Sequence, residues 1–233
     1  MILSWVEDAK RRAVLKALES IKTGWIIGLG SGSTMSYAVK ELAALRRARH
    51  IEITVVPTSY QIEGLAIAHG LPIRGINEVG TIDYAIDGAD QVEEGTLNVI
   101  KGGGGAMLRE KIIDSAAHKL AIVIHESKIT KHLGINQTIP VEVHPFAYKY
   151  VQSRIVKLGG RPKLRHSTNK VGPVITDNGN FLLDADFGII HNPALLERRL
   201  KAIPGLLETG LFLNMADKVY VGLKDDVRLV TSK

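Results

Sequence analysis

Residues 101–110, KGGGGAMLRE, combine residue types that could move a proton beside a bound ligand. Four successive glycines pack nothing and carry an entropic cost, so such a run is typical of a backbone that a ligand approaches closely. Glu110 falls in the first turns of a predicted helix, where its side chain leans back over the glycines and the helix end favours the carboxylate. A general base needs that form at neutral pH. The alternative is an ordinary acidic residue near a helix start, beside a flexible loop.

Residues 28–34, GLGSGST, form a second candidate, a glycine-rich turn between a predicted strand and a predicted helix. Glycines let the backbone curl so that amide N–H groups point at an anion, and Ser31, Ser33 and Thr34 add hydroxyl groups around Gly32. No Lys-Ser or Lys-Thr pair follows, so the turn is not a Walker loop, and alone it is weak evidence for a dinucleotide. The alternative is a tight turn in which Ser33 or Thr34 caps the helix.

The segment IDGAD, residues 86–90, places Asp87 and Asp90 on either side of Gly88 and Ala89 directly after an apolar strand. Two carboxylates at the end of a strand could hold the hydroxyl groups of a ligand or pass protons. Taken alone, an Asx turn is the simpler interpretation, because an aspartate side chain readily accepts from nearby backbone amides.

The sequence offers no motif for a metal, a nucleotide or a covalent nucleophile. It has no cysteine, none of its eight histidines falls in an HExxH arrangement, and no serine lies in a GxSxG elbow. We therefore predict a site with no metal and no cofactor. Lys101, which precedes the glycines, is the remaining candidate for stabilising negative charge.

The elements that must position these loops alternate between helices and short apolar strands, which is typical of an α/β domain. The predicted helices cover residues 5–20, 33–47, 58–69 and 106–118, and the predicted strands cover 25–29, 51–56, 84–86, 97–100 and 120–124. The candidate loops follow strands, and ligands of open α/β sheets bind beyond the carboxyl ends of the strands. One shared site is therefore expected.

From about residue 135 the pattern becomes strand, helix, strand, strand, helix, strand. It includes helices over 146–158 and 193–201 and a hairpin at Asn178-Gly179, since both residues tolerate positive φ. The expected fold is α/β, a Rossmann-like doubly wound sheet domain (1–133 plus 207–233) with a smaller ferredoxin-like α+β domain (134–206) inserted before the C-terminal strand, 218–223. We expect the insert to serve in oligomerisation or as a lid.

Composition favours a globular protein that binds a small anion. Of 233 residues, 45% are hydrophobic and 23% charged, and the net charge is +6. The basic residues are scattered and aromatic residues make up only 5%, so no nucleic-acid partner is predicted. The absence of cysteine, of a signal-peptide pattern and of an apolar run of ~20 residues predicts a cytoplasmic protein without membrane association.

Several motifs occur together in an order that resembles the ribose-5-phosphate isomerase, type A, family. They are GLGSGST, PTSYQ, DGAD, KGGGGAMLREK, HESK and IPGLLETGLF, and they span nearly the whole chain. The sequence departs from the usual KGGGAALT pattern at Gly105 and Leu108, which leaves the stiffness of this loop open.

The resemblance implies roles for individual residues. The turn around Ser31 would bind phosphate, Asp87 and Asp90 would lie near the sugar, and Glu110 would be the catalytic glutamate. Lys128 would bind substrate, and Lys10 matches a basic residue near the phosphate less securely. The implied catalytic residues are Glu110, Asp87, Asp90 and Lys101, and the implied substrate-binding residues are Ser31, Gly32, Ser33, Thr34, Asp87, Gly88, Ala89, Asp90, Lys101, Gly102, Gly103, Gly104 and Lys128.

The implied activity is interconversion of D-ribose 5-phosphate and D-ribulose 5-phosphate through an enediolate, in the non-oxidative pentose phosphate pathway, by a homodimer or homotetramer. Glu110 would be the general base. Two alternatives stay open. One is a non-catalytic sugar-phosphate-sensing domain, although the segment before Trp25 is too short for a helix-turn-helix with its own core. The other is a related sugar-phosphate isomerase or an amino-sugar-phosphate deaminase.

Overall fold

The computed structural model describes residues 3–169 and 171–231, which form two compact units. Unit 1 comprises the chain up to Ala89, residues Arg109–Lys128 and the chain from Met215 onward. Unit 2 comprises Asp90–Leu108 and Ile129–Asn214. This partition assigns more of the chain to the second unit than the predicted insert 134–206. The boundaries of the insert, and its role in oligomerisation or as a lid, stay predictions.

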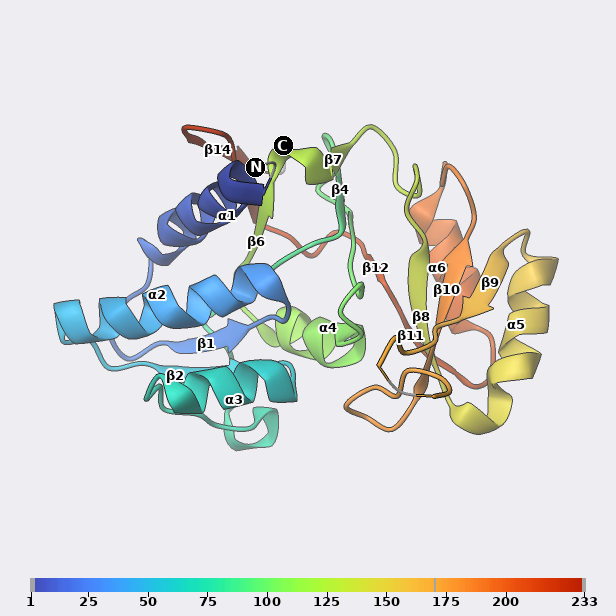
Figure 1. Cartoon of the computed structure of the whole chain (residues 1–233), viewed down its shortest axis with the longest axis horizontal. Coiled ribbons are helices and arrows are strands. Elements are labelled where there is room, and N and C mark those ends of the chain that lie inside the picture. Colours follow the sequence, from blue (N-terminus) through green and yellow to red (C-terminus); the bar gives the residue numbers. More distant parts are fainter. Residues whose placement is uncertain (1–2, 170, 232–233) are drawn as a thin grey trace. The chain divides into compact units, whose positions relative to one another are not determined.

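Unit 1 is built on a six-stranded sheet with the order β14-β13-β6-β3-β1-β2. Its strands β14, β6, β1 and β2 are labelled in Figure 1. All neighbours pair in parallel except β13 and β14, which are antiparallel. The strands are β1 (Ile26–Leu29), β2 (Thr54–Pro57), β3 (Tyr84–Asp87), β6 (Leu120–His125), β13 (Lys218–Gly222) and β14 (Val227–Thr231). The helices are α1 (Leu3–Leu18), α2 (Ser33–Arg49), α3 (Tyr60–Ala68) and α4 (Met107–Ala116), with short 3-10 turns η1 (Ile76–Glu78) and η2 (Glu126–Lys128). The predicted doubly wound α/β sheet is confirmed.

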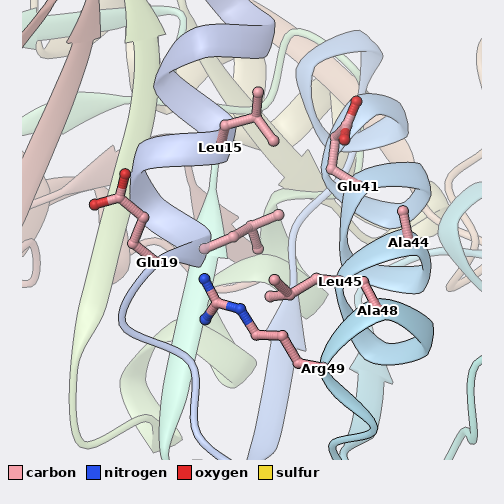
Figure 2. A pocket seen from close by; sticks show the side chains of 8 residues that line it. Leu15, Glu19, Glu41, Ala44, Leu45, Ala48 and Arg49 are labelled. Carbon is pink, nitrogen blue, oxygen red and sulfur yellow. The ribbon is translucent and has the colours of Figure 1, made fainter.

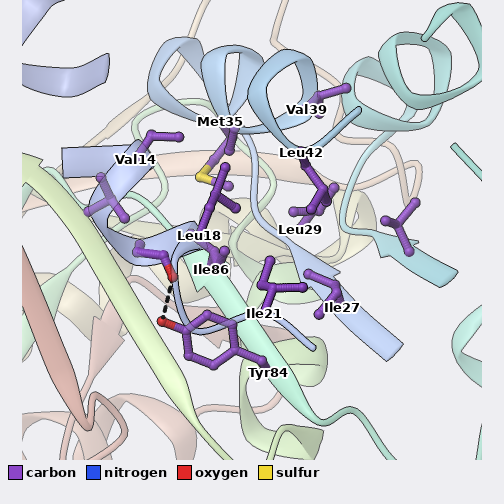
Figure 3. Close-up of a cluster of buried hydrophobic side chains, with 14 of the residues drawn as sticks. Val14, Leu18, Ile21, Ile27, Leu29, Met35, Val39, Leu42, Tyr84 and Ile86 are labelled. Atoms are coloured by element: carbon purple, nitrogen blue, oxygen red, sulfur yellow. Dashed lines mark hydrogen bonds between the residues drawn. The ribbon is translucent and has the colours of Figure 1, made fainter. Parts of the chain in front are cut away.

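The core of unit 1 explains why its central strands are apolar throughout. Leu29 of β1 and Ile86 of β3 pack against Met35 and Leu42 of α2 and Leu18 of α1 on one face of the sheet (Figure 3). On the other face a second cluster, around Val56, Ile82 and Ile113, packs α4 against the strands. Strands that are buried on both faces cannot alternate apolar and polar residues.

Unit 2 contains an antiparallel sheet with the order β11-β8-β10-β9. Its elements are β8 (Ile139–Val143), η3 (Pro145–Ala147), α5 (Tyr148–Lys157), β9 (Arg161–Leu164), β10 (Phe181–Asp186), α6 (Pro193–Lys201) and β11 (Leu206–Thr209). Val141 and Leu183 of the sheet share one apolar cluster with Val151 of α5 and Leu200 of α6. The chain therefore follows the predicted ferredoxin-like sequence of strands and helices.

A second small sheet of unit 2 has the order β12-β5-β4-β7. Its strands are β4 (Gln91–Glu93), β5 (Val99–Ile100), β7 (Ile129–Thr130) and β12 (Leu211–Phe212). The sequence predicted only the strand at 97–100, because strands of two or three residues are too short to show a periodicity. The prediction also missed β14, an edge strand whose exposed residues give it no apolar run.

The predicted hairpin at Asn178-Gly179 is only partly correct. Gly179 has a φ of 79° and its N–H donates to the carbonyl of Thr176, but Asn178 is not among the residues with positive φ, so the turn is not the expected two-residue type. The run before it forms a single bridge, Ile175 to Phe181, in place of a strand. The Asn178 amide instead donates to the buried carboxylate of Glu142 at 3.0 Å, which holds this loop against the sheet.

Several predicted ends of elements are also displaced. The strand predicted at 51–56 begins at Thr54, the helix predicted to end at 118 ends at Ala116, and the helix predicted from 146 begins at Tyr148 after a 3-10 turn. Within the described residues, no helix is long and apolar enough to cross a membrane.

Candidate active site

Hydroxyl groups gather where β1 and β2 end in unit 1. The Ser31 hydroxyl donates to Ser59 Oγ at 2.6 Å and lies 2.7 Å from Thr58 Oγ1. Because Leu29 pairs with Pro57 in parallel register, the segments that follow the two strands leave the sheet side by side. Thr58 and Ser59 were missed as candidate site residues, although PTSYQ was among the motifs. Their position after a strand adjacent to β1 was the signal that could have found them.

The glycine-rich turn leads directly into α2. Gly32, with a φ of 99°, occupies the N-cap position, and no side chain caps the helix there, so the capping alternative for Ser33 or Thr34 is wrong. The Gly32 N–H donates to the side-chain oxygen of Gln61 at 3.0 Å, a further contact that the sequence did not indicate. Ser33 is the first helical residue. The first amide N–H groups of a helix have no acceptor within it and attract an anion.

Two lysines add positive charge near this helix end, and a histidine lies beside them. Lys10 Nζ donates to Ser33 Oγ at 3.2 Å and to the Glu7 carboxylate at 2.8 Å. Burial, followed by the positive charges of Lys128 and Lys10, lowers the pKa of His125, so both lysines lie near this imidazole. Lys10, the less secure candidate, thus contacts the predicted phosphate turn. The cluster is suited to a phosphate dianion.

Two carboxylates meet the same turn of unit 1. Asp87, the last residue of β3, is fully buried and accepts from the Gly88 N–H at 2.6 Å. A Cβ atom at position 30 would collide with this carboxylate, so Gly30 lies directly against Asp87. Glu110, which is 4% exposed, accepts from the Ser31 N–H at 3.3 Å through Oε1. The acidic side chain predicted to lean back from α4 is therefore buried against the predicted phosphate turn and does not face solvent.

Replacing Gly30 with alanine should disrupt this arrangement. The new methyl group would occupy the place of the Asp87 carboxylate, so either that side chain or the turn carrying Ser31 must move. We expect turnover to fall by about 100-fold, the cost of a displacement of about 1 Å at a reacting centre. Steady-state kinetics with the sugar phosphate that the family resemblance implies would measure the fall.

The matched control is Gly64→Ala in α3, where a Cβ atom meets nothing within 4 Å. That exchange should leave turnover unchanged and stabilise the helix by about 1 kcal/mol. Equal turnover in the two variants would contradict the packing role assigned to Gly30.

The remaining candidates belong to unit 2. Asp90 precedes β4, and its N–H donates to the carbonyl of Ile100 at 2.8 Å, while Lys101 directly follows β5. The Gly103 N–H donates to Asp90 Oδ2 at 2.7 Å. Lys101 is 3% exposed, and its ammonium lies 5.4 Å from the centre of the Phe212 ring.

Two positions of the glycine loop have a backbone conformation that favours glycine. Gly102 and Gly105 have φ values of 98° and 82°, in the left-handed region that other residues rarely adopt. Gly105, one of the two departures from the usual family pattern, is therefore a residue suited to its backbone conformation. Gly104 is exposed, and a Cβ atom there would meet nothing within 4 Å.

The sequence candidates thus fall into two groups. Unit 1 brings together Ser31, Asp87 and Glu110 through direct contacts with one turn. Unit 2 brings Asp90 to the glycine loop that follows Lys101. In the chain, Gly88 and Ala89 join the first group to the second.

Among the described residues, no group of three or more histidine, aspartate or glutamate side chains could hold a metal ion.

A cavity of about 330 Å³ lies between α1 and α2 (Figure 2), and no candidate site residue contributes to it. Its lining consists of Leu15, Leu18, Glu19, Glu41, Ala44, Leu45, Ala48 and Arg49.

Comparison with known proteins identifies the family. Residues 54–226 match the family model described as ribose 5-phosphate isomerase A (phosphoriboisomerase A). The chain belongs to the ribose 5-phosphate isomerase A family. The resemblance inferred from the six motifs is therefore confirmed.

Relatives within the ribose 5-phosphate isomerase A family are similar over almost their whole length. Ribose-5-phosphate isomerase A of Methanococcus aeolicus is 44% identical over 96% of this chain and 94% of its own. The solved structure of ribose 5-phosphate isomerase A from Methanocaldococcus jannaschii superposes with a TM-score of 0.94 at 40% identity, covering 97% of this chain and 99% of that one. Another solved D-ribose-5-phosphate isomerase, in complex with phospho-erythronic acid, gives a TM-score of 0.94 at 41% identity, with the same coverage.

Proposed function

We propose that the chain interconverts D-ribose 5-phosphate and D-ribulose 5-phosphate, as an aldose–ketose isomerase of the pentose phosphate pathway. The observation that carries the proposal is the Glu110 carboxylate, buried at 4% exposure and bonded to the backbone of the anion-binding turn. Membership of the ribose 5-phosphate isomerase A family supports the choice of substrate.

The phosphate group is assigned to the N-terminus of α2. Residues Ser31, Gly32, Ser33 and Thr34 offer amide N–H and hydroxyl donors. Lys10 contacts Ser33, and Lys128 adds positive charge near His125 together with Lys10. Anchoring the phosphate orients the distant carbonyl end of the sugar, and orientation lowers the entropic part of the barrier.

Proton transfer is assigned to Glu110. Asp87 or Asp90 assists opening of the furanose ring, which exposes the C1 aldehyde. Glu110 then takes the proton from C2, and the electron pair left behind forms the C1–C2 double bond of an enediolate, with negative charge on the C1 oxygen. Protonation of that oxygen, loss of the O2 proton and return of the carbon-bound proton from Glu110 to C1 complete the ketose. Lys101 and the amides of Gly102 and Gly104 are the proposed donors to the oxyanion, while the Gly103 N–H is bonded to Asp90.

The decisive experiment incubates purified, metal-stripped protein with ribose 5-phosphate and follows the appearance of ketose. We expect reversible conversion without added metal. In deuterated water we expect deuterium on C1 of the ketose, the carbon that receives the proton. Binding without turnover would favour the sugar-phosphate sensor instead. Release of ammonia from glucosamine 6-phosphate would favour the deaminase.

Three further expectations stay predictions. They are the absence of a cofactor, a cytoplasmic location and assembly as a homodimer or homotetramer.

A titration with a sugar-phosphate analogue such as phospho-erythronic acid, which a solved relative binds, would test ligand binding directly.

A further inference from the structure

Arg165 connects the antiparallel sheet of unit 2 with the glycine loop. It follows β9, and its side chain is 18% exposed. Its Nε donates to Asp184 Oδ2 at 2.8 Å, and its Nη2 pairs with the other oxygen of the same carboxylate. Such two-point pairing fixes the plane of a guanidinium group. The remaining nitrogen, Nη1, donates to the carbonyl oxygens of Gly102 and Gly103, both at 3.1 Å.

These contacts hold the peptide group between Gly102 and Gly103 at both ends. Its carbonyl oxygen accepts from Arg165, and its N–H donates to the Asp90 carboxylate at 2.7 Å. Because a trans peptide is planar and its C=O and N–H point in opposite directions, a cation at one end and an anion at the other resist rotation of the group. The Gly103 carbonyl also points at Arg165, so the N–H of Gly104 points away from it.

The glycine loop supplies only part of this order by itself, through the bond from the Gly105 N–H to the Gly102 carbonyl at 3.0 Å. It has no side chains to pack, and glycine populates positive and negative φ about equally well. Donors that stabilise a developing oxyanion are effective only when they are oriented before the reaction begins. A loop that must be both open to a ligand and rigid therefore needs a partner that holds its carbonyls.

We propose that Arg165, oriented by Asp184, is a positioning residue for the isomerisation, which fixes the glycine-loop amides that stabilise the enediolate. The proposal rests on the proposed function. It adds a residue of the ferredoxin-like sheet, outside the motifs of the sequence, to the groups on which turnover depends.

The test compares Arg165→Met with Arg161→Met. Arg161 lies on β9 and pairs with Asp186 of β10 at 2.7 Å, a similar pair on the same two strands, and is 76% exposed. We expect Arg165→Met to lower kcat by about 100-fold, the cost of a misplaced group. The affinity of Arg165→Met for inorganic phosphate should stay within about twofold of that of the unmodified protein, because other residues form the turn to which the phosphate is assigned. Arg161→Met should retain full turnover.

Two further readouts separate positioning from general destabilisation. Affinity for phospho-erythronic acid, whose planar carboxylate resembles the enediolate, should fall in parallel with kcat in Arg165→Met. Amide hydrogen exchange at Gly103 should speed up by about tenfold or more, since its donor bond is no longer held. Arg165→Lys should restore little, because an ammonium cannot reproduce the fork that binds a carboxylate and two carbonyls at once.

The proposal is overturned if Arg165→Met turns over within twofold of the unmodified protein, or if Arg161→Met loses as much. If Arg165→Met does not fold, Asp184→Asn decides by the same criteria, because it weakens the two-point pairing while keeping the guanidinium. A failure of the proposed function gives a different result from a failure of the role proposed for Arg165. In that case the unmodified protein produces no ketose, while the exchange at Gly103 still reports whether Arg165 holds the loop.

Discussion

Replacing Glu110 with glutamine is expected to lower kcat by roughly 10²- to 10⁴-fold, the usual contribution of a general base. Glutamine has the same shape and retains an oxygen that can accept from the Ser31 N–H, but it cannot take a proton from carbon. Ketose formation from ribose 5-phosphate would measure the loss. Affinity for phospho-erythronic acid should change far less than kcat, since binding and proton transfer are separate tasks.

The matched control for this prediction is Glu52→Gln, an exposed glutamate of unit 1 that contributes to neither group of candidates. It should behave like the unmodified protein. Near-normal turnover in Glu110→Gln would remove that residue as the base and would turn attention to Asp87, the other carboxylate buried at the same turn.

Replacing Lys128 with alanine should raise KM for ribose 5-phosphate by about 10- to 100-fold, because a hydrogen bond between charged groups contributes more than a neutral one. Turnover at saturation should change little, since the phosphate is held equally in the ground state and the transition state. Lys40→Ala, which removes an exposed lysine of α2, is the control and should leave KM unchanged. An unchanged KM for ribose 5-phosphate in Lys128→Ala would exclude this lysine from the phosphate site.

His125 provides an internal reporter for the same prediction. Its pKa is lowered by burial and by the positive charges of Lys128 and Lys10. A phosphate dianion bound beside those lysines favours the protonated imidazole, so the pKa of His125 should rise when inorganic phosphate binds. An NMR titration of its ring protons would show the rise. A pKa that does not move at saturating phosphate would place the anion elsewhere.

Local patterns were enough to predict the class of fold and to single out candidate site residues. Glu110 was identifiable because the side chain of an acidic residue in the first turns of a helix leans back toward the glycines that precede the helix. In the structure this side chain is buried against Ser31. The buried strands of unit 1 were identifiable as apolar runs between helices. Whether the candidate residues act as predicted stays open to the experiments above.

Contacts between distant segments could not be predicted in the same way. Thr58 reaches Ser31 only because β1 and β2 are neighbours in the sheet, and the pairing of strands is not written in either segment alone. Arg165 reaches Gly103 across 62 positions in the chain, and it follows a strand whose sequence RPKL shows little apolar character. The Asn178 turn was predicted from its own two residues, but the Glu142 carboxylate on another strand binds its side chain.

The sequence by itself determined the α/β class, the ferredoxin-like order of elements and the list of proton-transferring and anion-binding candidates, because these depend on neighbouring residues and on periodicity. Tertiary structure alone decided which hydroxyl groups surround Ser31, that Gly30 lies against Asp87, and that Arg165 donates to the carbonyls of Gly102 and Gly103. The physical reason is that hydrogen bonds and close packing act over a few ångströms of space, whatever the separation along the chain.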